Sequence, residues 1–153
     1  MTQINARPTA PVFCTRTLVI HARPGLVWSI LTDVNSWPSW HPLISRAHMN
    51  APLPAPGGRF TWKVNGASIN SVFHTVEPCR LLGWTGTTLG GSAIHNWFMA
   101  EHGEGTQIRV EESMEGWLVR LFKKKMNASL AADMEAWLGN LKRKAEQMEV
   151  PAR

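Results

Sequence analysis

His95 and Glu112 are the two residues of this sequence whose types and positions could support acid–base chemistry together. The segments on either side of Gly103 alternate in polarity like paired strands. If Glu101 lies opposite Thr106 across that turn, His95 lies opposite Glu112. A carboxylate that faces a core needs a partner, and a histidine beside it could supply one. In a cavity this pair could act as a general acid or base; the alternative is that the two side chains only satisfy each other.

The same strand pairing predicts which face of the sheet is buried. It places Trp97 opposite Val110 and Met99 opposite Ile108, and these apolar pairs mark the inner face. Arg109 falls on the other face with further charged residues, toward solvent. We therefore expect the histidine and the carboxylate of the first pair to point inward.

Tryptophan is unusually frequent in this chain, with eight residues beside five phenylalanines and no tyrosine. Each tryptophan supplies a large apolar surface and one hydrogen-bond donor that can face a ligand. This composition favours an aromatic-lined cavity, with a purely aromatic core as the alternative. The residues that we expect to contact a ligand are Trp40, His41, Trp62, Trp84, Trp97, Met99, Phe122, Met126 and Leu130.

Other chemical signatures are not found in the sequence. It contains no nucleophile elbow, metalloprotease motif, phosphate-binding loop or dinucleotide fingerprint, and its histidines lack metal-ligand spacing, so we expect neither metal nor cofactor. Cys14 and Cys79 are isolated and are expected to be free thiols in a reducing compartment. With no long apolar segment, we expect a cytoplasmic protein without stable membrane insertion.

The net charge of +5 is spread along the chain, so a nucleic-acid partner is not expected. Only residues 123–125 and 142–144 form basic clusters, and both are interpreted as solvated faces of a helix rather than phosphate-binding patches. The oligomeric state is left open.

Strands and helices are predicted from the period of the apolar residues. A strand over 15–21 precedes a helix that begins at Pro24, and residues 118–148 read as one long amphipathic helix packed on a sheet. The further predicted strands are 60–64, 69–76, 81–88, 94–100 and 106–115. Residues 1–13 are expected to be a flexible arm, 14–149 a single domain and 150–153 a tail.

The stretch NSWPSWHPLI, residues 35–44, cannot form a long helix because of its two prolines. Pro38 favours a single turn that begins near Trp37, and Pro42 ends it at or before His41. We interpret this turn as a structural clasp at one end of a groove, rather than a catalytic cluster. A histidine at the entrance of a cavity could still contact a ligand.

The order of the predicted elements resembles that of the START-like, or SRPBCC, superfamily, and specifically its polyketide cyclase/dehydrase-like bacterial branch. The resemblance runs from about Thr15 to Gln147. It is carried by PGLVWSIL at 24–31, Asp33 with WPSWHP at 37–42, Val76-Glu77-Pro78 with Leu82 and Trp84, His95-Asn96-Trp97, and Gly105-Thr106 leading to Glu112 and Gly116.

This resemblance implies an α+β helix-grip fold, in which a curved antiparallel sheet of seven strands wraps around a long C-terminal helix and two short helices follow the first strand. Such proteins bind apolar small molecules such as lipids, polyketides or aromatic compounds between sheet and helix. His95 and Glu112 match positions where relatives often carry these residue types, whereas His41 stands where relatives often have asparagine or another polar residue.

Three functions follow as hypotheses. The first is binding, transport or sequestration of a hydrophobic small molecule. The second is a polyketide cyclase or dehydratase that uses His95 and Glu112 as a proton shuttle. The third is a co-chaperone or antitoxin-like interaction module, in which basic clusters dock on an acidic protein surface.

Overall fold

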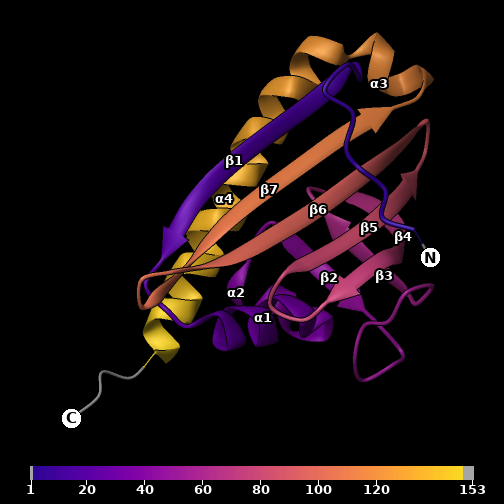
Figure 1. Cartoon of the computed structure of the whole chain (residues 1–153). Helices are drawn as coiled ribbons and strands as arrows, with labels where there is room; N and C mark the ends of the chain where they lie inside the picture. The colour runs from indigo at the N-terminus through magenta and orange to yellow at the C-terminus, as the bar shows by residue number, and fades with distance from the viewer. Residues whose placement is uncertain (1, 150–153) are drawn as a thin grey trace.

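The computed structural model describes residues 2–149, and the expected tail at 150–153 lies outside them. It has the α+β helix-grip architecture (Figure 1). The strands are β1 (Val12–Ile20), β2 (Ile44–His48), β3 (Arg59–Val64), β4 (Ala67–Glu77), β5 (Leu81–Thr88), β6 (Gly91–His102) and β7 (Gly105–Glu115). The helices are α1 (Pro24–Thr32), the 3-10 turn η1 (Val34–Ser36), α2 (Trp37–Trp40), α3 (Trp117–Leu121) and α4 (Lys123–Met148).

All seven strands form one antiparallel sheet in the order β1-β7-β6-β5-β4-β3-β2. The sheet curls around α4, which lies along its inner face beside β1 (Figure 1). The predicted pairing of the last two strands is confirmed, with His95 opposite Glu112 and Trp97 opposite Val110. The first strand begins at Val12 rather than at Thr15, because pairing with β7 continues to Met114.

Strand β2 was not recognised in the sequence. It is short, its exposed residues do not alternate because Ser45 and Arg46 are both exposed, and its pairing with β3 shifts by one residue between Ile44 and Arg46. A β-bulge of this kind breaks the regular period on which strand prediction depends. Within residues 2–149, the structure has no helix that is both long and apolar enough to cross a membrane.

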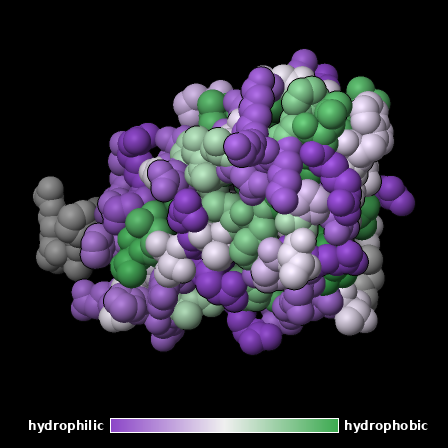
Figure 2. Space-filling model, turned by 90° about the horizontal axis from the view of Figure 1, so that it is seen from above, coloured by the Kyte–Doolittle hydropathy of each residue, from purple (hydrophilic) through white to green (hydrophobic). Residues whose placement is uncertain are grey.

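The predicted single C-terminal helix is wrong at one point, because Phe122 separates α3 from α4. This residue leaves helical geometry, with φ −112° and ψ 32°. Helix α3 is anchored to the β5–β6 turn, where the Leu118 backbone N–H donates to the Gly90 carbonyl at 3.1 Å and Val119 is buried. Figure 2 looks down on the end of the molecule that carries α3, where hydrophobic and hydrophilic residues adjoin on the surface.

The single turn predicted around Pro38 is confirmed as α2, which ends before His41. Trp37 is fully buried, and its ring meets Trp62 and Trp137 at 5.7 and 5.1 Å between centroids. Its indole N–H donates to the Leu31 carbonyl at 3.0 Å. The N-terminal end of the turn is therefore held by core contacts of Trp37.

Side chains of α4 satisfy the outer backbone edge of β1. Asn127 accepts a hydrogen bond from the Phe13 N–H at 3.2 Å and donates one to the Pro11 carbonyl at 2.9 Å. Farther along, Lys142 donates to the Val19 carbonyl at 3.0 Å. Since these backbone groups have no strand partner on that side, the helix supplies the missing bonds.

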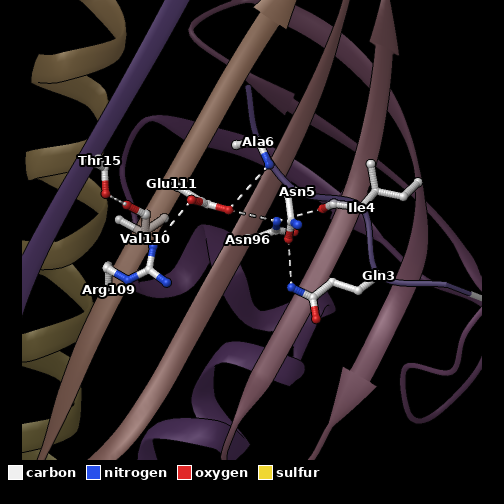
Figure 3. Close-up of polar contacts among 9 residues, drawn as sticks. All are labelled: Gln3, Ile4, Asn5, Ala6, Thr15, Asn96, Arg109, Val110 and Glu111. Atoms are coloured by element: carbon white, nitrogen blue, oxygen red, sulfur yellow. Dashed lines mark hydrogen bonds and ion pairs between the residues drawn. The ribbon is translucent and has the colours of Figure 1, made fainter. Parts of the chain in front are cut away.

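The N-terminal segment crosses the outer face of the sheet, opposite α4 (Figures 1 and 3). Asn96 of β6 donates from Nδ2 to the Ile4 carbonyl at 2.8 Å and to Glu111 Oε1 at 3.1 Å. The Ala6 N–H reaches the same Glu111 oxygen at 3.4 Å (Figure 3). Residues 4–6 thus hydrogen-bond to side chains of β4, β6 and β7, whereas the sequence indicated only an arm without periodicity.

Candidate functional site

A cavity of about 570 Å³ lies between the inner face of the sheet and helices α3 and α4. Four tryptophans supply much of its wall, namely Trp62, Trp84, Trp97 and Trp137. They come from β3, β5, β6 and α4, so the curl of the sheet is what brings their rings together. A cavity of this size, mostly apolar and with few polar groups, is typical of a small-molecule site.

His95 and Glu112 lie side by side in this cavity, as the register requires. The histidine is 4 % exposed and the glutamate 6 %, and Nδ1 of the ring lies against Oε1 of the carboxylate. The imidazole is stacked between Trp84 and Trp97, with ring centroids 4.5 and 5.5 Å away. These contacts fix the plane of the imidazole and leave its second nitrogen as the free end.

Three nitrogen atoms of the site are buried without a hydrogen-bond partner among residues 2–149, namely Nδ1 and Nε2 of His95 and Nε1 of Trp97, and both residues line the cavity. Nδ1 of His95 lies against the Glu112 carboxylate, which leaves Nε2 and the indole nitrogen of Trp97 to be satisfied. An unsatisfied buried polar group costs about 1–3 kcal/mol. The site therefore holds polar groups whose hydrogen bonds are not made within residues 2–149.

Asp133 adds a second carboxylate to the cavity, one that sequence analysis missed. Its Oδ2 accepts a hydrogen bond from Asn65 Nδ2 at 2.9 Å, and burial raises the pKa of this carboxyl, with the nearby charge of Glu112 acting in the same direction. The residue follows Leu130 by three positions and precedes Trp137 by four. That spacing on the apolar face of the helix was the available signal.

The structure brings together seven of the residues that were expected at the site. They are His95, Glu112, Trp62, Trp84, Trp97, Met126 and Leu130. Sequence analysis overlooked several further lining residues, among them Asn65, Met114, Val119, Ser129, Asp133, Met134 and Trp137. Most of these stand next to an expected residue on the same element, so the element was identified but the extent of the cavity was not.

Trp40, His41, Met99 and Phe122 lie outside the cavity lining. Trp40 and Met99 are buried in the core, and Phe122 is 49 % exposed because the helix breaks there. His41 is fully buried, accepts a hydrogen bond from Asn140 Nδ2 at 3.2 Å, and packs on Trp137 with ring centroids 4.6 Å apart. Burial lowers the pKa of His41 to about 4, so its imidazole is neutral at physiological pH.

Within residues 2–149, no group of three or more histidine, cysteine, aspartate or glutamate side chains could hold a metal ion. The chemistry that these residues offer is therefore proton transfer and hydrogen bonding at the His95–Glu112 pair, in surroundings that are otherwise aromatic and apolar.

Comparison with known proteins gives one family match, to polyketide cyclase/dehydrase and lipid transport, over residues 14–146. No curated protein sequence matches significantly.

Three solved structures illustrate the likeness in fold. A hypothetical protein, jhp0584, from Helicobacter pylori aligns with a TM-score of 0.82 at 18 % identity, covering 95 % of this chain and 99 % of that one. The Zhui aromatase/cyclase from Streptomyces sp. R1128 aligns at 0.76 with 16 % identity, covering 88 % and 93 %. A START superfamily protein from Mycobacterium smegmatis aligns at 0.71 with 14 % identity, covering 89 % and 98 %.

Proposed function

Since the chain belongs to the polyketide cyclase/dehydrase and lipid-transport family, we propose that it binds a hydrophobic, ring-containing small molecule in the cavity between sheet and α4. The observation that carries this proposal is the cavity of about 570 Å³ walled by four tryptophans. Aromatic walls favour flat rings, which can stack on or meet the edges of the indoles.

The ligand that fits best has one polar end. His95 and Trp97 line the cavity, and a ligand oxygen that reaches Nε2 of His95 or the indole nitrogen of Trp97 would supply a missing hydrogen bond. The rest of the ligand would face apolar side chains such as Met126 and Leu130. A hydroxylated or keto-substituted aromatic compound, polyketide or lipid meets these requirements.

The test is native mass spectrometry of protein incubated with a panel of polyketides, sterols and fatty acids. We expect at least one class to give a complex with one ligand bound. Met126→Trp would fill part of the cavity and should reduce the bound fraction at least tenfold. Met148→Trp is the matched control, because this methionine lies on the same helix but is 46 % exposed and outside the cavity. Absence of binding for every class would contradict the proposal.

A second candidate function, catalysis of cyclisation with dehydration, is favoured by the contact between His95 and Glu112 inside the cavity. In this scheme Nε2 of His95 takes a proton from the carbon between two substrate carbonyls. That carbon then forms a bond with another carbonyl carbon, whose oxygen is protonated to a hydroxyl. Loss of this hydroxyl as water, with removal of a second α-proton, leaves the ring unsaturated. Glu112 would act as a positioning residue by holding Nδ1.

Glu112→Gln tests this candidate. It should leave the bound fraction unchanged and lower the turnover of a poly-β-ketone thioester at least a hundredfold. Glu135→Gln, on the outside of α4 with its side chain 70 % exposed, is the control. Equal turnover in the variant and the wild type would show that Glu112 takes no part in the reaction, and no turnover in the wild type would argue for ligand binding without catalysis.

A further inference from the structure

The end of the molecule that carries α3 exposes a group of large apolar side chains. These are Leu89 at 81 %, Leu121 at 67 %, Trp117 at 66 % and Phe122 at 49 % exposed, here called the apolar patch. Elsewhere in the chain, most apolar side chains of this size are buried. An exposed group of several such residues is typical of an interaction surface.

Local geometry makes the patch continuous. Leu89 precedes Gly90, and a Cβ added at Gly90 would lie only 3.1 Å from Cε2 of Trp117, so the β5–β6 turn and α3 are in direct contact. Trp117 and Leu121 are four residues apart, which places them on the same side of α3. The helix break at Phe122 separates this helix from α4, which begins at Lys123.

Basic side chains border the apolar patch. Arg120 and residues 123–125, all lysine, are exposed, and residues 117–125 contain no acidic residue. Among the described residues none of these four cations forms an ion pair, while nearby Glu115 pairs with Arg7 at 3.3 Å. The segment therefore carries four uncompensated positive charges (Figure 2 shows hydrophilic and hydrophobic residues side by side on this end).

The patch lies next to one end of the cavity. Thr88 and Gly91 on the β5–β6 turn, Val119 of α3 and Met126 of α4 all contribute to the cavity lining. The same short elements thus carry the residues of the apolar patch and the residues that line this part of the cavity. A surface bound at the patch would lie close to a bound ligand.

We propose that the apolar patch and its basic border dock this protein on the surface of an anionic membrane. A tryptophan with neighbouring leucine and phenylalanine side chains fits the interface between headgroups and acyl chains, where the indole N–H stays hydrated. The four cations face anionic headgroups, and each basic side chain close to such a surface raises the partition coefficient about fivefold. Charge complementarity selects a membrane rather than an apolar protein groove, which would leave these cations without partners.

Co-sedimentation with lipid vesicles tests the proposal. The protein should bind vesicles that contain phosphatidylglycerol, bind those of pure phosphatidylcholine at least tenfold more weakly, and be released at about 1 M salt, where the Debye length is about 3 Å. Lys124→Glu/Lys125→Glu should lower the partition coefficient at least tenfold. Leu121→Ser should lower it about fivefold through the lost apolar area.

Two matched controls keep the test specific. Arg143→Glu/Lys144→Glu makes the same change of charge at the other basic cluster of α4, and Leu53→Ser removes a leucine that is 71 % exposed on a distant loop. Both should bind vesicles like the wild type. The proposal is wrong if the control charge reversal is equally harmful, if Leu121→Ser has no effect, or if phosphatidylcholine binds as well. These variants lie outside the cavity, so cavity binding should be unchanged in all of them and is scored separately.

Discussion

His74 and Asn96 meet across the strand that separates them, with Nε2 of the histidine 3.0 Å from Oδ1 of the amide. They belong to β4 and β6, and the contact passes over Gly83 of β5. Nδ1 of His74 accepts a hydrogen bond from the Ile4 N–H at 3.2 Å, which assigns the imidazole proton to Nε2. The absence of a side chain at Gly83 is what permits this network on the outer face.

Gly83→Ala should therefore destabilise the protein. A Cβ at this position would lie 2.4 Å from Cε1 of His74 and 2.5 Å from Oδ1 of Asn96. We expect the free energy of unfolding to fall by about 1–3 kcal/mol, measured by chemical denaturation. Gly139→Ala in α4 is the control, because nothing lies within 4 Å of its added Cβ, and it should leave the stability equal or higher. An unchanged stability for Gly83→Ala would show that the network can move aside without loss.

Burial of His41 predicts a pH dependence of stability. Its pKa is about 4 in the folded protein against 6.5 as the ordinary value, so the unfolded chain binds a proton first as the pH falls. The stabilisation that comes from the neutral His41 is complete above pH 6.5, and it is lost as the pH falls from 6.5 to about 4. Over that range the free energy of unfolding falls by at most about 3 kcal/mol through His41. Burial lowers the pKa of His74 too, so both histidines act in the same direction.

The measurement is the free energy of unfolding at several pH values for the wild type and for His41→Gln. Glutamine cannot titrate, so the difference between the two proteins should shrink as the pH falls from 6.5 toward 4. A difference that is constant with pH would mean that the folded imidazole titrates normally.

Asp133→Asn should raise the stability slightly at neutral pH. The pKa of this carboxyl is raised, so ionisation is disfavoured in the folded state and destabilises it at pH values above the ordinary value of 3.8. The asparagine can still accept a hydrogen bond from Asn65. We expect a gain of less than about 1 kcal/mol at pH 7, because solvent screens part of the effect. Thermal unfolding at pH 7 and pH 3.5 gives the comparison, and a loss of stability at pH 7 would contradict it.

Trp40→Ala should affect folding more than ligand binding. The side chain is 9 % exposed in the core and does not line the cavity, so its removal leaves an internal void and should cost about 3–5 kcal/mol. Denaturation measures this cost, and the ligand affinity of the folded fraction should change less than twofold. Trp117→Ala, at a position that is 66 % exposed, should cost less than about 1 kcal/mol.

The sequence allowed prediction of the strands with regular alternation and of their register. His95 opposite Glu112 followed from one turn at Gly103, because side chains alternate with a period of two in every strand. Strand β2 was missed because a bulge interrupts that period, and the break at Phe122 was missed because the four-residue spacing of Leu118, Phe122 and Met126 continues across it.

Site residues were predicted best where they lie on the paired strands. Trp84 and Trp97 could be assigned to the inner face from strand polarity, and both line the cavity. Met99 shares that face but lies beyond the end of the cavity, and the sequence has no measure of where a cavity ends. To predict that Asp133 lines the cavity, one would have to know how α4 is rotated about its axis. That rotation is a property of the packed structure.

The bonds between α4 and the outer edge of β1 also bear on association between copies of the chain. An uncovered edge strand presents backbone groups to which a strand of another molecule can add. Asn127 and Lys142 occupy such groups at Phe13, Pro11 and Val19. The opposite edge, β2, is short and bulged, with the charged Arg46 in its middle. Both edges of the open sheet are thereby protected against strand addition, and with it against aggregation.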